Sequence, residues 1–231
     1  MNFLELCQNM ARESGISRNM TSVSGQTGRL ADVVSWVNQA WRSIQNLHPN
    51  WNFMRAPFTV AMTAADGLYL ASDCTDVRAG APISRFGAWI NNSLRIYRTS
   101  DGASQTTPLP YLEYDEFDLQ YQMATVANGR PVCFSVRPYD NALLIGPTPD
   151  DAFTVRGEFY RSAGTLTADG DVPEMPAQFH WAIVWRAIEL YAINEESAPL
   201  IVTARSELSE IMGRLEANQL PEITFGAPLV P

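Results

Sequence analysis

Residues 29–55 read RLADVVSWVNQAWRSIQNLHPNWNFMR, an amphipathic helix followed by a short aromatic segment. Apolar side chains recur at steps of three and four residues, which places them on one stripe of a helix; they are Leu30, Val33, Val34, Val37, Trp41, Ile44 and Leu47. His48-Pro49 predicts the end of this helix, because proline disfavours helical geometry in the preceding residue and cannot extend the hydrogen-bond ladder. Such a stripe needs other helices to cover it.

Three further segments have helical spacing. Residues 3–11 predict a short first helix that Ser14-Gly15 ends. Ala177–Asn194 is apolar nearly all round, which is typical of a helix in the centre of a bundle or pressed against a neighbouring subunit. A fourth helix starts at Ser197-Ala-Pro199, and its packing seam runs from Ile201 to Leu215.

The middle of the chain has a different pattern, in which short β-branched and aromatic runs alternate with turn-forming residues. The predicted strands are Ala56–Met62, Leu68–Ala71, Leu94–Thr99, Pro131–Arg137, Ala142–Ile145 and Phe153–Arg161. In the last of them, Phe153, Val155 and Phe159 alternate with polar residues, the period of a half-buried strand. Tyr111–Gln122 is acidic and predicts a short helix or turn at the edge of a small antiparallel sheet or sandwich.

Together these elements predict an α+β chain. Residues 1–52 and 173–218 form an antiparallel helical bundle, and residues 53–172 are a β-rich insertion between the second and third helices. The joint between bundle and insertion is expected at His48, Pro49, Trp51 and Phe53. Residues 219–231 form an extended C-terminal tail.

Apolar side chains at two places indicate packing or assembly. Four tryptophans at helical spacing are expected in the bundle core or at a subunit interface: Trp36, Trp41, Trp181 and Trp185. The tail is apolar although prolines interrupt it, whereas tails without a partner are usually polar. Its side chains therefore need a docking surface, on another chain or on their own domain: Ile223, Phe225, Leu229 and Val230.

Composition limits the partners. The 231 residues carry a net charge of −9, with 25 acidic residues against 16 basic ones, all arginine. This balance opposes binding to anionic membranes and non-specific binding to DNA, both of which need clustered positive charge. It suits a surface that DNA passes without being gripped, or simple solubility. The N-terminus lacks the features of a signal peptide and no window is apolar enough to span a membrane, so folding inside the cell is expected.

Motifs for catalysis or metal binding are absent from the sequence. It has only two histidines, His48 and His180, and no serine-hydrolase elbow, phosphate loop or zinc-protease helix. The three cysteines are widely spaced and are expected to act as small apolar side chains. The acidic run from Glu113 to Asp118 lacks the ligand alternation of a calcium loop, so a solvated face is favoured. We therefore predict no catalytic residue, metal or cofactor.

Three segments resemble the adaptor, or head-completion, proteins of tailed bacteriophages. They are WVNQAW…LHPNWNFMR (36–55), NALLIGPTPDDAFTVRGEFYRS (141–162) and VPEMPAQFHWAIVWRAIELYA (172–192). The resemblance covers most of the chain in the order helices, β insertion, helices and tail. It implies a non-enzymatic structural protein of the virion neck, made in the host bacterial cytoplasm.

The resemblance also implies partners. A ring of twelve copies would dock beneath the portal protein, with the helices facing the portal and the β insertion facing the next neck or tail protein. The apolar tail would reach into the portal assembly, and DNA would pass only as cargo. One alternative is a tail terminator or another neck ring protein. An alternative from a different class is a monomeric β-rich module that binds glycan or peptide at an exposed tryptophan, Trp51 or Trp89.

Overall fold

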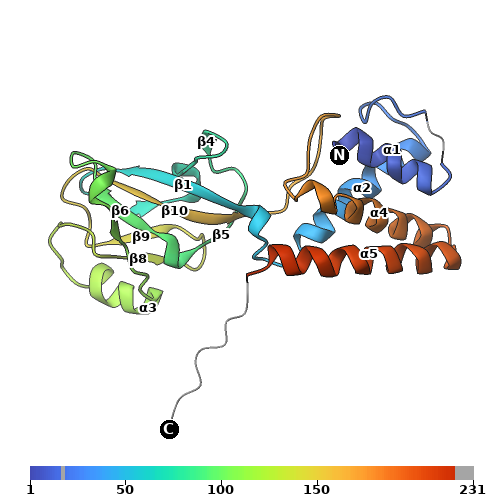
Figure 1. Ribbon diagram of the computed structural model, residues 1–231. Helices are drawn as coiled ribbons and strands as arrows, with labels where there is room; N and C mark the ends of the chain where they lie inside the picture. The colour runs from blue at the N-terminus through green and yellow to red at the C-terminus, as the bar shows by residue number, and fades with distance from the viewer. Residues whose placement is uncertain (17–18, 222–231) are drawn as a thin grey trace, which may run out of the picture. The chain divides into compact units, whose positions relative to one another are not determined.

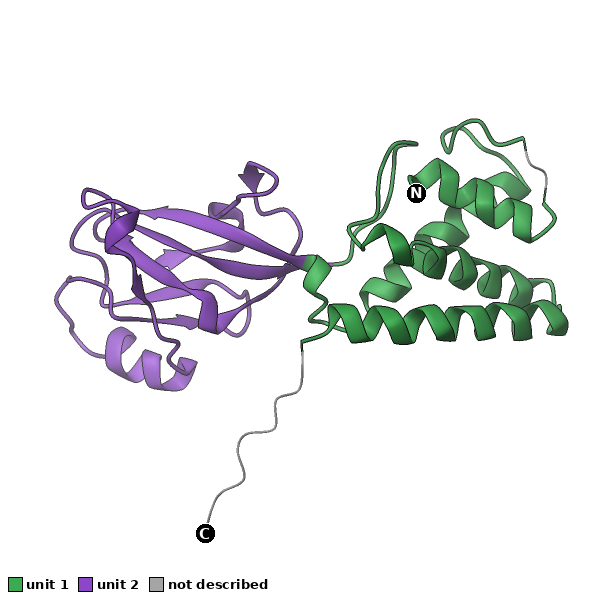
Figure 2. Cartoon of the chain, in the orientation of Figure 1, with its two compact units in different colours: residues 1–54, 163–231 green, residues 55–162 purple. Residues whose placement is uncertain are grey.

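The computed structural model describes residues 1–16 and 19–221 (Figure 1). The chain divides into two compact units, one made of residues 1–54 and 163–231 and the other of residues 55–162 (Figure 2). The first unit is helical and the second contains antiparallel sheets. The predicted α+β class is therefore confirmed.

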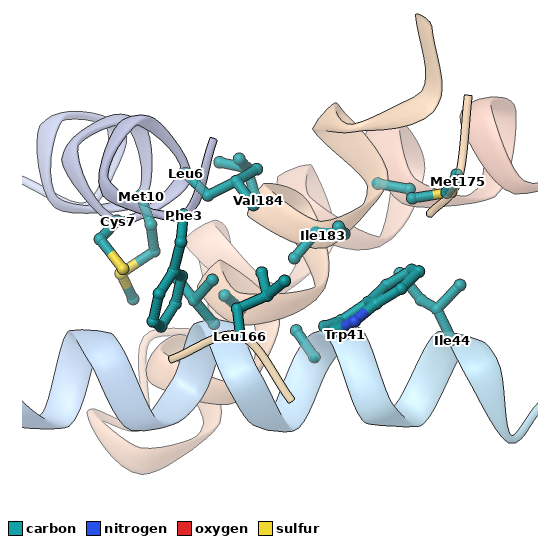
Figure 3. Packing of buried hydrophobic residues seen from close by; sticks show 14 of the residues in the cluster. Phe3, Leu6, Cys7, Met10, Trp41, Ile44, Leu166, Met175, Ile183 and Val184 are labelled. Atoms are coloured by element: carbon teal, nitrogen blue, oxygen red, sulfur yellow. The ribbon is translucent and has the colours of Figure 1, made fainter. Parts of the chain in front are cut away.

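Helix α4 is the centre of the helical unit, because it contacts each of the other three long helices. The helices are α1 (Phe3–Glu13), α2 (Arg29–Gln45), α4 (Trp181–Asn194) and α5 (Ala198–Gln219), with short 3-10 turns η1 (Asn52–Met54) and η6 (Ala177–Phe179). Figure 3 shows the resulting core, in which Leu6 of α1 lies beside Val184 of α4, the Phe3 ring points toward α2, and Trp41 extends from α2. Every α4 residue at positions 182–184 and 187–188 is buried, which explains the apolar character of this segment.

Helix α2 ends two residues earlier than the apolar stripe predicts. Its last residue is Gln45, and Leu47 is 53% exposed, so the assignment of Leu47 to the buried stripe is wrong. The chain has already left helical geometry there, and its side chain no longer follows the 3.6-residue period. At the other end Gly28 is the N-cap, with a positive φ of 56° and no side-chain cap.

Polar side chains of α2 hold the segment that leads back into the helical unit. The Asn38 amide donates to the Leu166 carbonyl at 3.0 Å and accepts from its backbone N–H at 2.9 Å. Gln45 is buried and makes the same pair of bonds with Gly164, each at 2.9 Å. Asp169 accepts from the Val23 backbone N–H at 2.6 Å. These bonds satisfy backbone groups that have no ladder partner.

The second unit has two antiparallel sheets. One is ordered β4-β3-β1-β10-β6-β7, with β5 also paired to β10, and the other is ordered β2-β9-β8. Its strands are β1 (Arg55–Met62), β2 (Leu68–Tyr69), β3 (Thr75–Asp76), β4 (Ala81–Pro82), β5 (Phe86–Trp89), β6 (Arg95–Arg98), β7 (Thr107–Pro108), β8 (Cys133–Val136), β9 (Leu143–Gly146) and β10 (Phe153–Arg161). Short 3-10 turns connect them: η2 (Ala71–Asp73), η3 (Asn91–Ser93) and η4 (Ala103–Gln105).

Strand β10 shows how the two sheets share one core. Its residues Phe153, Val155 and Phe159 are buried, as their alternation predicts, in a cluster that includes Phe134 of β8. Gly157 lies in the same row, where a Cβ atom would come within 3.0 Å of the Phe58 ring, so only glycine fits without displacement. The side chains of the alternate positions form the outer face of the larger sheet.

A third layer covers the smaller sheet. It consists of α3 (Tyr114–Phe117) and the π-helical turn η5 (Asp118–Gln122), within the segment predicted as a short acidic helix. Phe117 packs against Cys133 and Leu144, which point away from the core shared by the two sheets. The acidic helix therefore lies on the far side of the smaller sheet from the larger one.

Candidate docking surfaces

A groove on the helical unit contains two of the predicted tryptophans. Trp181 and Trp185, one turn apart on α4, are both partly exposed, and their ring centroids lie 6.2 Å apart. The groove has a volume of about 350 Å³. Residues of α1, η6 and α5 also line it: Glu13, Gln178, Glu207, Glu210, Ile211 and Arg214. Three carboxylates face one guanidinium there. The groove suits an apolar side chain flanked by positive charge.

The other two helical tryptophans occupy different environments. Trp41 is 2% exposed and stacks on Phe53, with ring centroids 6.0 Å apart, so it belongs to the core of the helical unit. Trp36 is partly exposed and meets the Tyr191 ring edge-on at 5.4 Å. The four residues thus divide between core and accessible surface, a division that helical spacing alone does not predict.

The predicted joint residues form an aromatic cluster inside the helical unit. Trp51 is fully buried, and its indole N–H donates to the Ile44 carbonyl at 3.0 Å. The His48 ring meets Trp51 at 4.8 Å, and its Nε2 lies 3.1 Å from a carboxylate oxygen of Glu216 on α5. Phe53 stacks on Trp51 at 5.3 Å. Pro49 lies between His48 and Trp51, after the end of α2, and the cluster ties α2 to α5 through the Ile44 carbonyl and Glu216.

The predicted tail residues Ile223, Phe225, Leu229 and Val230 lie outside the described residues. The described chain continues past α5 through Leu220, which packs against the helical core. The Leu220 backbone N–H also donates to the Glu216 carbonyl at 3.0 Å. The helical unit therefore uses the chain at least as far as Leu220.

His180 is buried at the start of α4. Its Nε2 lies 2.9 Å from the Met175 carbonyl, and its Nδ1 lies 2.8 Å from the N-terminal amine of Met1. A carbonyl only accepts, so Nε2 carries the proton and Nδ1 accepts in the neutral ring. Burial lowers the pKa of His180 below its ordinary value. The residue is a neutral structural link between α1 and α4.

Glu189 is the one acidic residue among the buried residues of α4, a helix that lies entirely within the described part of the chain. It is 5% exposed and accepts from the guanidinium of Arg186 on the same helix and from Nε of Arg205 on α5 at 2.8 Å. Burial on its own would raise the pKa of Glu189, but the hydrogen bonds from Arg205 and Arg186 outweigh burial and lower it. This network joins α4 to α5.

A second groove, about 770 Å³, lies on the outer face of the larger sheet and was not predicted from the sequence. Strands β1, β6 and β10 place three guanidinium groups there, those of Arg55, Arg95 and Arg156, beside one carboxylate, Glu158. Arg55 hydrogen-bonds to Glu158, with Nε 2.8 Å from the carboxylate oxygen. Two positive charges are left over on this face, although the chain as a whole is acidic. The alternation of polar residues in β10 was the only sequence signal for it.

No group of side chains in residues 1–16 and 19–221 has the composition of a metal site. The three cysteines are free and buried, and burial raises the pKa of Cys7 and Cys74 to about 12, which leaves both thiols protonated and unreactive. None of the helices in the described part of the chain combines the length and apolar content of a membrane span.

The two tryptophans expected to be free for ligand stacking are both buried. Trp51 is 0% exposed and Trp89 is 8% exposed, and the Trp89 indole N–H donates to the Asn141 carbonyl at 2.8 Å. Each ring is therefore enclosed by protein and unavailable to a sugar or a peptide. The glycan- or peptide-binding alternative loses the feature on which it rested.

Comparison with known proteins gives one assignment. No curated protein matches the chain. A protein-family model described as SU10 adaptor protein matches residues 1–230. Because this match extends over nearly the whole chain, both compact units included, the chain belongs to the SU10 adaptor protein family, a family of phage adaptor proteins.

Proposed function

We propose that this protein is a head-to-tail adaptor that forms a ring beneath the portal, connects it to the next neck or tail protein, and lines the DNA channel. Family membership makes it a structural protein of the virion that contacts other capsid or neck proteins. The ring, its twelve copies and the portal as a partner come from the resemblance of residues 36–55, 141–162 and 172–192 to head-completion proteins.

The observation that carries the proposal is the groove at Trp181 and Trp185. Two large aromatic rings remain partly exposed on the most apolar helix that the structure describes, although residues 182–184 and 187–189 of that helix are buried. Tryptophan is enriched among the residues that dominate binding energy at protein interfaces. We assign portal docking to this groove together with the apolar segment that contains Ile223 and Phe225.

The net charge of −9 fits a channel through which DNA moves. Phosphate groups are repelled by an acidic lining, so the DNA is not held by it. A tail terminator or another neck ring would have the same charge and the same structural class. Contact with the portal distinguishes the adaptor from these proteins.

The test is the mass of the protein alone and after mixing with the portal ring of the same phage. The proposal expects a complex that contains the portal and multiple copies of this chain. The double substitution W181A/W185A is expected to weaken its formation at least tenfold, whereas W36A, an equally aromatic change outside the groove, is expected to leave it intact. Failure of the unaltered protein to bind the portal would contradict the proposal.

A further inference from the structure

Two arginines on the outer face of the larger sheet are placed against each other. Arg95 of β6 and Arg156 of β10 are direct cross-strand partners, and like charges in this position destabilise a sheet. Arg156 is held by a hydrogen bond to Thr106 Oγ1 at 2.8 Å, with its guanidinium 5.7 Å from the Tyr97 ring centroid. The Arg95 side chain is exposed, and its guanidinium makes no hydrogen bond or ion pair with any described residue. A carboxylate seated between the two would remove the repulsion.

Arginine binds such a carboxylate more specifically than lysine does. Its planar guanidinium presents paired donors that match the two oxygens of a carboxylate, and it stacks on aromatic rings such as that of Tyr97. Apolar surface lies nearby, since Val77 also lines the groove and is 55% exposed. The groove therefore fits a segment that carries both acidic and apolar side chains.

The same compact unit carries such a segment on its opposite side. In α3, Asp115 and Glu116 are exposed, and the exposed fractions of Leu119 in η5 and of Met123 directly after it are 64% and 73%. The helix packs on the outer face of the smaller sheet, while the arginines lie on the outer face of the larger one. Figure 1 shows β1 and α3 on opposite sides of residues 55–162.

We propose that the arginine groove binds the acidic α3–η5 surface of a second copy of this chain. A contact between two different faces of identical subunits is heterologous and produces a ring when its rotation closes. The inference rests on the proposed function in that it assigns the contact between neighbours in the adaptor ring. It places that contact on residues 55–162, apart from the helical groove assigned to the portal.

Charge distribution favours a protein segment over nucleic acid as the occupant. Glu158 lies in the groove and forms an ion pair with Arg55. Of the three arginines in the groove, only Arg95 and Arg156 are therefore available to phosphates. Binding to DNA normally requires neutralisation of several phosphates and a basic face, whereas this chain has a net charge of −9. The acidic α3–η5 surface supplies carboxylates and apolar contact together.

Charge reversal on each face tests the contact. The full chain is made as R95E/R156E and separately as D115R/E116R, and its self-association is measured by sedimentation at low salt over a range of concentrations. Each variant alone is expected to associate at least tenfold more weakly than the unaltered chain. A mixture of the two is expected to recover association, because each altered face then meets an opposite charge on the other variant. Added salt should weaken association of the unaltered chain.

The matched control is R12E/R78E, which makes the same change of net charge at two exposed arginines outside the groove. It should associate like the unaltered chain. The inference is overturned if the unaltered chain does not self-associate either in solution or on the portal, if neither groove variant weakens association, or if their mixture stays apart. Loss of duplex DNA binding in R95E/R156E with unchanged self-association would assign the groove to nucleic acid instead.

Mass measurement on the portal separates this inference from the proposed function. Self-association through the two faces without any portal binding would refute the portal adaptor and leave the contact standing. If the unaltered chain and both charge variants fill the portal ring equally, the contact is refuted and the portal adaptor stands.

Discussion

At the scale of single residues, the helical tryptophans separate stability from assembly. Trp41 and Trp185 are the same residue type in the same unit, but only Trp41 is enclosed by the core. Truncation of an enclosed aromatic side chain removes its burial and leaves a cavity, whereas truncation at a groove leaves space that water can fill. Their substitution therefore has different consequences.

We expect Trp41→Ala to lower the free energy of unfolding by about 3–5 kcal/mol, and Trp185→Ala by about 1–2 kcal/mol. Urea denaturation followed by circular dichroism measures both without relying on tryptophan fluorescence. Trp185→Ala should also weaken portal docking. An equal loss of stability for the two variants would place Trp185 in the core and remove it from the proposed docking groove.

The buried His180 predicts a dependence of stability on pH. Its pKa in the folded chain lies below the ordinary value of 6.5, so the unfolded chain binds the proton more readily. Stability is therefore greatest above that value and falls as the pH decreases through 6.5 towards the folded-state pKa. Carboxylates with lowered pKa values, Glu189 and Asp76, add their own loss only at lower pH, below 4.5 and 3.8.

The measurement is the free energy of unfolding from about pH 7 down to about pH 5 for the unaltered chain and for His180→Gln. Glutamine keeps a donor for the Met175 carbonyl but does not titrate. The variant should be less stable at pH 7 and should show a shallower decline with falling pH. Parallel curves would mean that another group produces the decline.

At the scale of elements, the ion pairs of Glu189 join α4 to α5. Replacing both arginines, as R186M/R205M, leaves a buried carboxylate without a partner. Loss of the partners of a buried charge costs about 3–5 kcal/mol, and since the Arg205 side chain is 63% exposed, we expect a smaller loss of about 2–3 kcal/mol at neutral pH.

The contribution of Glu189 to the pH dependence has the opposite sign in this variant. In the unaltered chain the pKa of Glu189 is lowered, so its contribution is present above its ordinary pKa of 4.5 and is lost as the pH falls below it. Without the arginines only burial remains, which raises the pKa of Glu189, so the stability difference between R186M/R205M and the unaltered chain should shrink on mild acidification. The contribution of His180 is the same in both chains and cancels in this difference. R186K/R205K keeps both charges and serves as the control. A difference that stays constant or grows on acidification would show that the carboxylate is not buried.

The helices and the long strands can be predicted from the periodicity of apolar residues in the sequence, whereas the short strands cannot. Helix α2 and strand β10 have enough residues to display their periods, and both were predicted. Strands β3, β4 and β7 have two residues each, too few to display a period, and are defined by their pairing: β3 with β1 and β4, and β7 with β6. The Arg95–Arg156 pair depends on the same long-range register, so neither residue was singled out from the sequence. The sequence also did not predict that Trp181 and Trp185 are exposed, because α4 has apolar residues on nearly every side and no polar face marks its accessible surface.

At the scale of the whole molecule, three surfaces of the described chain combine charged side chains with apolar ones. The helical groove with Trp181 and Trp185 is acidic, the outer face of the larger sheet is basic, and the α3–η5 surface is acidic and partly apolar. A connector between two other protein rings needs one surface for each layer and two for its neighbours in its own ring. We assign the helical groove to the portal and the two faces of residues 55–162 to the ring.

The C-terminal segment provides a test of the proposed portal contact. Residues 222–231 contain the apolar side chains predicted to dock, while Leu220 packs on the helical core. Removal of residues 222–231 is expected to leave the free energy of unfolding within about 0.5 kcal/mol of the unaltered value, because the proposed function assigns their apolar side chains to the portal and not to the core of this chain. It is expected to weaken portal binding at least tenfold.

Removal of residues 219–231 provides the comparison. It deletes Leu220 and its hydrogen bond to the Glu216 carbonyl as well, so we expect an additional loss of about 1–2 kcal/mol of stability. Denaturation of the two truncated chains, together with the mass of each after mixing with the portal, separates the two roles. If the shorter truncation already unfolds the protein, residues 222–231 belong to its own core. If it binds the portal as tightly as the unaltered chain, docking depends on the Trp181 and Trp185 groove alone.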